Sequence, residues 1–336
     1  MNLDAATAKS DDPRTQRIAA AFERTNRKKY ENYVVTGVWH RLRDKGILLE
    51  PVTQQYVKRP EGYALLDLYF PALNVSVECD EKHHLSQAAA DRRRTLDILE
   101  ADKVDPLRAI SAVSAGAFEE LRVVCADLPE GGGDPVFKPV EEIDGQIDEV
   151  VAEIVRRYKE LGRPAWDPRP DVEKLAESPE IRVSDGWLFP RICDIVNGFG
   201  SRKKDGSPYG NHDFWSGSAK LREDGRWMFF LHLTVPGAES GRFDNLLDFE
   251  NGKMVVTEYC NDPDSSRNVI AAWERDRALA ANGTPPQVLI FGRARNAFGT
   301  KGYRFLGEFK LAGTDLAGNP ASRKWKRVSE TAKTIR

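Results

Sequence analysis

A dense group of ionisable side chains closes an otherwise apolar stretch, DLYFPALNVSVECDEKHH, at residues 67–84. Asp67 stands near the end of one strand-like run, and Glu78 and Asp80 lie two residues apart in the next. Because successive side chains of a strand point to opposite faces, Glu78 and Asp80 share a face. Carboxylates that meet from two adjacent strands suit Mg²⁺ or Mn²⁺. The pattern therefore predicts a divalent-metal site formed by Asp67, Glu78 and Asp80.

A metal held in this way is typical of enzymes that hydrolyse phosphodiesters, because the cation polarises the phosphoryl oxygen and helps to generate hydroxide. His83 or His84 is expected to act as general base or to protonate the leaving oxygen. Asp67, Asp80 and Lys82 also follow the two-acid-plus-lysine order of many nucleases. The alternative interpretation is a chance spacing of two acids and a lysine, with both histidines on a solvated surface.

Alternating helices and strands must position these residues. In the predicted helix 30–43, Glu31 falls on the apolar side, because its spacing to Val34, Val35 and Val38 is i, i+3, i+4, i+7. Glu31 either stabilises the helix N-terminus or points at whatever the helix packs on. The other predicted elements are helices at 14–24, 85–101 and 143–161, and strands at 51–58, 63–70, 73–80 and 121–125. This alternation predicts an α/β domain.

The second half of the chain has a different pattern. Residues 163–180 are rich in proline and polar side chains, which indicates a linker. Beyond them, short β-like runs at 227–235, 253–259, 288–291 and 303–311 alternate with turn residues, and a helix is expected at 265–281. We therefore expect an α/β domain over 1–162 and a β-rich domain, a twisted sheet or partly closed barrel, over 181–336.

Composition and charge limit the classes of protein that are possible. The chain is 40% hydrophobic and 30% charged, with no apolar run long enough to span a bilayer and no signal peptide. Its four cysteines are far apart, so buried free thiols in a reducing cytoplasm are expected rather than a cysteine-based zinc site. The net charge of −2 combines −8 in residues 1–180 (26 basic, 34 acidic) with +6 in residues 181–336 (24 basic, 18 acidic). The basic second half favours a polyanionic partner.

The segment GNHDFWSGSAKL at 210–221 is the first candidate for binding a base. Trp215 could stack on an extruded base, and Asp213, beside His212, could accept a hydrogen bond from cytosine N4. A second cluster places Asn245, with Asp244, near Glu258, Tyr259 and Asn261. The alternative is ordinary packing, because an aromatic residue in a β domain is usually core. Basic segments at 202–204, 293–301 and 323–327 are candidates for phosphate contacts.

Three runs, KKYENYVVTGVWHRL, VTQQYVKRPEGYALLDLYFPALNVSVECDEKHH and ADRRRTLDI, resemble the nuclease domain of the 5-hydroxymethylcytosine-dependent restriction endonucleases. That bacterial family cuts DNA carrying 5-hydroxymethylcytosine or its glucosylated form. The central run is also similar to the very-short-patch mismatch endonuclease (Vsr), which has a PD-(D/E)xK type of fold. The resemblance implies that Asp67, Glu78 and Asp80 bind the metal, with His83 and His84 at the centre. It also implies that Glu31 corresponds to a helix carboxylate found in such folds.

The run KGYRFLGEFKL at 301–311 resembles a strand of SRA (SET and RING associated) domains, with Tyr303 and Gly307 matching and Leu306 where an aspartate is usual. The resemblance implies an SRA-like domain that flips a modified cytosine out of double-stranded DNA.

Together these features predict a modification-dependent endonuclease that cuts at a fixed distance from the modified base. One centre cuts one strand, so a double-strand break implies a homodimer. Two alternatives remain open. One is a nicking endonuclease for mismatches or lesions, and the other is a noncatalytic protein that binds modified DNA.

Overall fold

The structure is a computed structural model of the chain, and it divides into two compact units. The first is Met1–Lys103, Ala115–Arg169 and Ala297–Gly299, and the second is Val104–Ser114, Pro170–Asn296 and Thr300–Arg336. The described residues are 17–18, 29–81, 88–103, 106, 116–129, 133–214, 217–235, 239–262, 266–294, 297–299 and 301–335. Lys82, His83, His84 and Trp215 lie outside them, as does the expected helix 14–24 apart from two residues.

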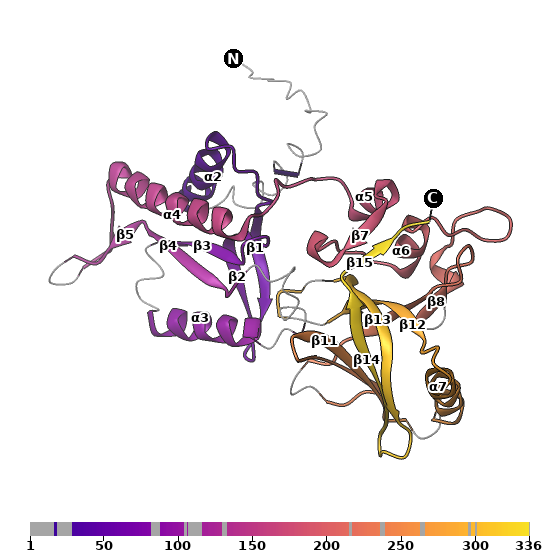
Figure 1. The fold of residues 1–336 in the computed structure, drawn as a ribbon. Helices are drawn as coiled ribbons and strands as arrows, with labels where there is room; N and C mark the ends of the chain where they lie inside the picture. Colours follow the sequence, from indigo (N-terminus) through magenta and orange to yellow (C-terminus); the bar gives the residue numbers. More distant parts are fainter. Residues whose placement is uncertain are drawn as a thin grey trace. The chain divides into compact units, whose positions relative to one another are not determined.

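A four-stranded sheet forms the middle of the first unit (Figure 1). Its strands, in the order β1-β2-β3-β4, are β1 (Val52–Lys58), β2 (Tyr63–Phe70), β3 (Val75–Asp80) and β4 (Glu119–Val124). The first three are antiparallel neighbours, whereas β4 runs parallel to β3. A parallel pair needs a crossover connection, and α3 (Ala88–Lys103) lies in that connection. Two short strands, β5 (Ala126–Asp127) and β6 (Val136–Phe137), pair separately.

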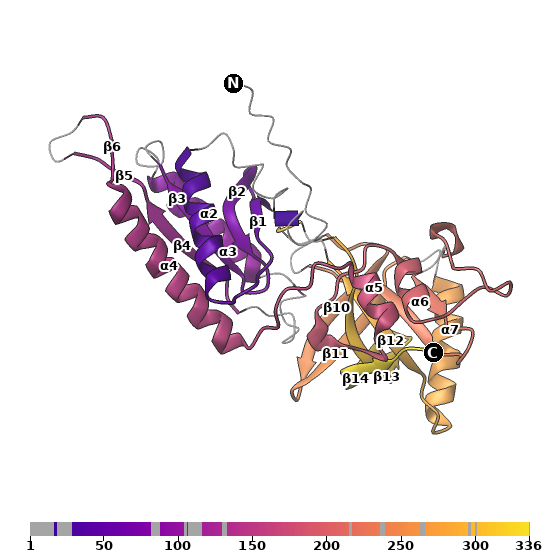
Figure 2. The same ribbon diagram turned by 90° about the horizontal axis from the view of Figure 1, so that it is seen from above.

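Helices cover both faces of this sheet, as Figures 1 and 2 show. The first face packs on α2 (Lys29–Asp44) and α4 (Val140–Leu161), whose apolar residues share one core with Val75, Val77 and Cys79 of β3. The opposite face packs on α3, where Ile98 is fully buried. The alternation predicted for residues 73–80 is confirmed, because the odd-numbered side chains enter the first core and leave the even-numbered ones for the other face.

The second unit is built on a seven-stranded sheet of order β10-β11-β14-β13-β12-β9-β8. Its strands are β8 (Ser218–Lys220), β9 (Trp227–His232), β10 (Phe243–Glu250), β11 (Lys253–Cys260), β12 (Gln287–Arg293), β13 (Arg304–Asp315) and β14 (Ala321–Ser329). A two-stranded sheet pairs β7 (Glu180–Arg182) with β15 (Thr331–Lys333), and the helices are α5 (Asp171–Glu177), α6 (Ile192–Gly198) and α7 (Ser266–Ala281). The expected combination of an α/β domain and a β-rich domain is confirmed.

Part of the interval 163–180 is folded. The backbone N–H of Trp166 donates to the carbonyl oxygen of Leu48 at 2.9 Å, within the first unit. Helix α5 begins at Asp171, and its Leu175 is fully buried in the core of the second unit. The first unit therefore extends through this interval as far as Arg169, and the second unit begins at Pro170.

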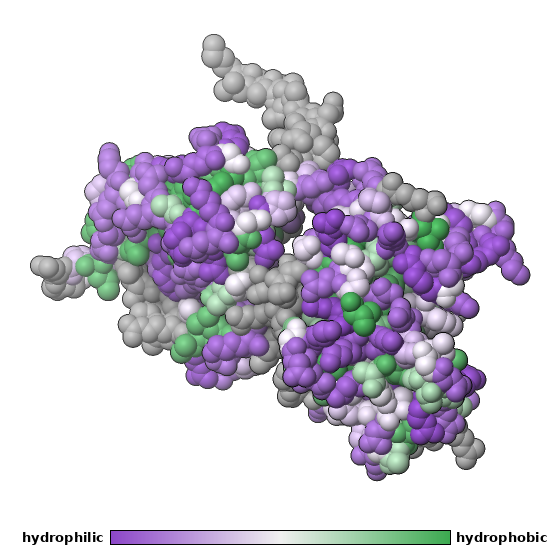
Figure 3. All heavy atoms as spheres, viewed as in Figure 1, coloured by the Kyte–Doolittle hydropathy of each residue, from purple (hydrophilic) through white to green (hydrophobic). Residues whose placement is uncertain are grey.

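All four cysteines are free and buried, as the sequence predicts. The sulfur atoms of Cys79 and Cys125 lie 3.5 Å apart in the core of the first unit. Among the described residues, no helix is both long and apolar enough to cross a membrane. Hydrophilic residues predominate on the face in view in Figure 3, where apolar residues form small separate groups.

The burial of Leu175 makes α5 part of the second unit. Leu175→Ala should lower the free energy of unfolding of that unit by about 2–5 kcal/mol, because it leaves a cavity in the core. Leu279→Ala, in the same unit but 48% exposed, should change it by less than about 0.5 kcal/mol. Urea unfolding of the full chain measures both. Similar effects of the two substitutions would show that α5 is a peripheral part of the linker.

Candidate nuclease centre and base-reading cluster

Asp67 is held from two sides in the first unit. Its Oδ2 accepts a hydrogen bond from the backbone N–H of Cys79 at 2.9 Å, and its Oδ1 accepts one from Nε2 of Gln54 at 3.2 Å. The pairing of Leu68 with Val77 places Asp67 opposite Glu78, one residue further along the two strands. The side chain is 8% exposed, so an ionised carboxylate here depends on these donors.

Glu31 reaches the same place from α2. The side chain is only 2% exposed, and its Oε1 accepts a hydrogen bond from Nε2 of Gln54 at 2.7 Å. The backbone N–H of Glu31 donates to Oε1 of Glu81 at 3.2 Å. Glu31 therefore points at the sheet on which its helix packs, which was the sharper of the two sequence interpretations. Gln54, which links Glu31 to Asp67, is a residue that sequence reasoning missed.

Glu78 lies on the face of β3 that packs on α3, where Arg94 forms an ion pair with it. Its Oε1 is buried and has no hydrogen-bond partner among the described residues. Burial and the nearby Asp67 carboxylate raise the pKa of Glu78 well above its usual range, although Arg94 acts in the opposite direction. Glu78 is thus a carboxyl group whose charged form is disfavoured by its surroundings, and one of its oxygens has no hydrogen-bond partner among the described residues.

Asp80 follows on the same face and is paired with Arg122 of β4. One terminal nitrogen of Arg122 donates to both carboxylate oxygens at 3.0 Å, and the other contacts Glu120. Oε2 of Glu120 is also buried without a partner in the part of the chain that is described. Parallel pairing of β3 with β4 explains the contact, because it sets Glu78 beside Arg122 and Asp80 beside Val124.

Among the residues that the structure describes, acidic groups outnumber basic groups in this cluster. Two guanidinium groups, those of Arg94 and Arg122, lie among five carboxylates, which are those of Glu31, Asp67, Glu78, Asp80 and Glu120. A hard divalent cation with oxygen ligands fits such a site better than a third arginine. Within the described residues, however, no three Asp, Glu, His or Cys side chains converge on one metal position. The predicted roles of Asp67, Glu78, Asp80, His83 and His84 therefore remain predictions.

In the second unit, the residues predicted to bind a base fall into separate groups. His212 and Asp213 are exposed in a short 3₁₀ helix (Asn211–Asp213), where Asp213 accepts from the Gly210 N–H at 2.6 Å and pairs with Lys203 at 2.7 Å. These bonds to Asp213 stabilise its loop. Trp215, two residues on, is not described.

A second group forms where β9 ends and β10 begins. Asn261 donates to Asp244 at 2.6 Å, and Asn245 donates to the His232 carbonyl oxygen at 2.9 Å. His232 Nε2 lies 3.4 Å from the Tyr303 hydroxyl, and the Arg293 guanidinium lies 4.9 Å from the centre of the Tyr303 ring. Asn245, His232 and Tyr303 thus form a connected polar group, which contains two of the predicted residues.

Glu258 faces Asn245 across the β10–β11 pairing but is engaged inside the protein. It pairs with Arg323, and its Oε2 accepts from the Trp325 indole N–H at 2.7 Å. Arg323 also pairs with Asp276 at 2.9 Å. Since Arg323 is largely buried in this network, the expectation that it contacts phosphates does not agree with the structure.

The two glycines of KGYRFLGEFKL have steric causes. Gly307 has φ +125°, and a Cβ added there would lie 2.5 Å from the Ser329 carbonyl oxygen. Gly302 has φ +135°, and its Cβ would lie 2.9 Å from the Phe189 carbonyl oxygen. Leu306 is fully buried in the core. The two glycines therefore allow a close approach to the backbone at Ser329 and Phe189. At the position where the family usually has an aspartate, Leu306 is a core residue.

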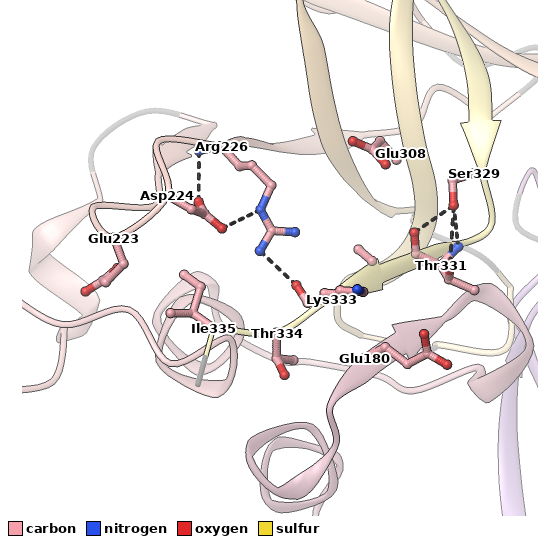
Figure 4. A pocket seen from close by; sticks show the side chains of 11 residues that line it. Glu180, Glu223, Asp224, Arg226, Glu308, Ser329, Thr331, Lys333, Thr334 and Ile335 are labelled. Atoms are coloured by element: carbon pink, nitrogen blue, oxygen red, sulfur yellow. Dashed lines mark hydrogen bonds and ion pairs between the residues drawn. The ribbon is translucent and has the colours of Figure 1, made fainter.

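A pocket of about 610 Å³ opens in the second unit (Figure 4). Arg226 donates to the Lys333 carbonyl oxygen there at 2.8 Å and pairs with Asp224 at 2.6 Å. None of the predicted base-binding residues is in its lining, which includes the carboxylates of Glu180, Glu223, Asp224 and Glu308. Because those carboxylates repel phosphates, we assign the pocket no part in DNA binding.

The chain thus has a three-layer α/β domain with a buried acidic cluster, followed in the chain by a β-rich domain. Residues 16–154 match the N-terminal domain of PvuRts1 I-like restriction endonucleases, and residues 174–334 match the SET and RING associated (SRA) domain. The chain thus consists of a PvuRts1 I-like nuclease domain and an SRA domain. The solved structure of the 5-hydroxymethylcytosine-specific restriction enzyme AbaSI has the same fold, with a TM-score of 0.55 and 23% identity over 96% of this chain and 97% of that chain. No curated protein matches the chain.

The contacts of Glu258 predict a structural role that a base contact would not share. Glu258→Ala should lower the stability of the second unit by about 3–5 kcal/mol, because it leaves the Arg323 charge buried beside Asp276 alone. The matched control is Glu250→Ala, which breaks the exposed pair with Lys324 and should cost less than about 1 kcal/mol. Thermal unfolding measures both. An unchanged melting temperature, combined with lost discrimination between modified and plain DNA, would place Glu258 in base reading.

Proposed function

We propose that this chain is a modification-dependent DNA endonuclease, whose first unit cuts and whose second unit reads 5-hydroxymethylcytosine or its glucosylated form. The observation that carries the proposal is the buried carboxylate cluster around Asp67 and Glu78, within a restriction-endonuclease domain that shares its chain with an SRA domain. The fold likeness to AbaSI, whose printed specificity is 5-hydroxymethylcytosine, supports this substrate.

Asp67, Glu78 and Asp80 would hold a Mg²⁺ or Mn²⁺ ion in the first unit. When bound, such an ion polarises the scissile phosphate and lowers the pKa of a bound water. Oε1 of Glu78, which has no hydrogen-bond partner among the described residues, would donate a lone pair to the ion. Arg94 and Arg122 would neutralise Glu78 and Asp80 in the absence of the ion, and Arg122, whose side chain is a third exposed, would contact a phosphate in its presence. His83 or His84 would move the proton at the attacking or leaving oxygen.

The second unit would enclose the extruded base. Trp215 would stack on it, and the polar group of Asn245 and Tyr303, with Asn261 nearby, would contact its edge. Glu258 and Asp213 would act through the strand and the loop that they stabilise, and the exposed His212 would contact the base from the same loop. A second copy of the chain would supply the cut in the opposite strand, so a homodimer is the expected active form, and its cuts would fall at a fixed distance from the base.

Digestion of matched duplexes tests the substrate and the metal together. Duplexes that differ only in carrying cytosine, 5-methylcytosine, 5-hydroxymethylcytosine or its glucosylated form should be cut in the presence of Mg²⁺ or Mn²⁺ only when hydroxymethylated, and not at all with chelator. Gel analysis of both strands gives the result. Nicks at mismatches without double-strand breaks would favour a repair-type nickase. Tight binding of modified DNA without any cleavage would favour a noncatalytic reader.

The metal site predicts a separation of cutting from binding. Asp67→Asn should reduce the cleavage rate by more than about 100-fold, which is the upper end of the loss for residues that only support metal ligands. Affinity for modified DNA should stay near that of the wild type, because base reading belongs to the other unit. Glu141→Gln, at an exposed position of α4, is the control and should cut normally. Cleavage by Asp67→Asn at a rate near wild type would refute the proposed centre.

A further inference from the structure

The backbone of β1 is distorted at one residue, Gln54. Register pairs Thr53 with Leu68 and Gln55 with Leu66, so Gln54 stands opposite Asp67, yet this one pair is missing from the ladder. Gln54 has φ +53°, a left-handed conformation that side chains other than glycine, asparagine and aspartate rarely adopt. Of the described non-glycine residues with positive φ, the other two are asparagines, Asn74 and Asn251. Strain of this kind persists where the surroundings determine it, often at functional sites.

The distortion directs the Gln54 amide at two carboxylates from different elements. Nε2 lies 2.7 Å from Oε1 of Glu31 on α2 and 3.2 Å from Oδ1 of Asp67 on β2. An amide nitrogen carries two hydrogens, so it can donate one to each acceptor. Because an ionised carboxylate only accepts, the nitrogen rather than the oxygen of the amide must face both groups.

The result is a fixed orientation for Asp67. With Oδ2 held by the Cys79 N–H and Oδ1 by Gln54, rotation of the carboxylate is blocked at both oxygens. The neutral donor also separates two buried negative charges without adding a third. We propose that Gln54 is a positioning residue, which holds Asp67 and Glu31 in the arrangement that binds the divalent metal. This inference rests on the proposed nuclease function.

Substitution of Gln54 tests the inference through metal affinity as well as cleavage. In Gln54→Leu, which keeps the bulk and removes both donors, the dissociation constant for Mn²⁺ should rise about 10- to 100-fold, as for residues that orient metal ligands. The EPR signal of free Mn²⁺ measures this affinity without DNA. Cleavage of hydroxymethylated duplex should lose kcat while KM for DNA stays unchanged. Gln55→Leu, the next residue of the strand, is the matched control and should behave as the wild type in the same assays.

Gln54→Gly keeps the test decisive if the leucine variant does not fold. Glycine accepts positive φ, so this variant relieves the backbone strain while it removes the side chain together with its amide. It should show the same weakening of Mn²⁺ binding, with a cooperative urea transition. Wild-type Mn²⁺ affinity and kcat in a folded Gln54→Gly would overturn the inference and reduce Gln54 to a packing residue. Absence of Mn²⁺ binding and of cleavage in the wild-type protein would instead refute the proposed function itself.

Discussion

Burial of like charges is the constraint on which the first unit depends. Carboxylates at Glu31, Asp67 and Glu78 are each less than a tenth exposed, and such groups repel one another strongly away from water. Four elements of the unit support the cluster: β3 with a backbone N–H, β1 with an amide, and α3 and β4 with one arginine each. The sheet and the α3 layer are thus more than a scaffold, since both bring donors to the cluster.

Much of this arrangement can be read from local sequence periods. The two-residue alternation of β3 separated Glu78 and Asp80 from Val75 and Val77, and the helical spacing placed Glu31 on the inner side of α2. Both inferences need only neighbours in the chain. Which arginine meets which carboxylate is a long-range matter: Arg122 lies 42 residues from Asp80, and only the parallel pairing of β4 brings them together. The left-handed backbone conformation of Gln54 could not be predicted from its residue type, because glutamine rarely adopts positive φ.

The second unit was harder to predict for a related reason. Strand β14, ASRKWKRVS, has two basic residues on each side of Trp325 and resembles a surface segment, yet it lies inside a seven-stranded sheet with Trp325 fully buried. Its Arg323 is turned inward by Glu258, a partner 65 residues away. Gly307 was recognisable through the resemblance to SRA domains, whereas the steric cause of the two glycines is long-range, because it is the backbone at Ser329 and Phe189 that excludes a side chain there. Trp215, His83 and His84 lie outside the described residues, so their predicted roles stand on sequence alone.

Three residues, Asp167, Pro168 and Arg169, separate Trp166, whose backbone is bonded to Leu48, from Pro170, where the second unit begins. Three extended residues reach about 11 Å at most. On double-stranded DNA, with about 3.4 Å per base pair along one strand, this length corresponds to roughly three base pairs. Under the proposed function, a change in the extension of these three residues would therefore shift the position of a cut by only a few nucleotides. The precision of the cleavage position would then depend on the length of this covalent connection as well as on the binding of the base.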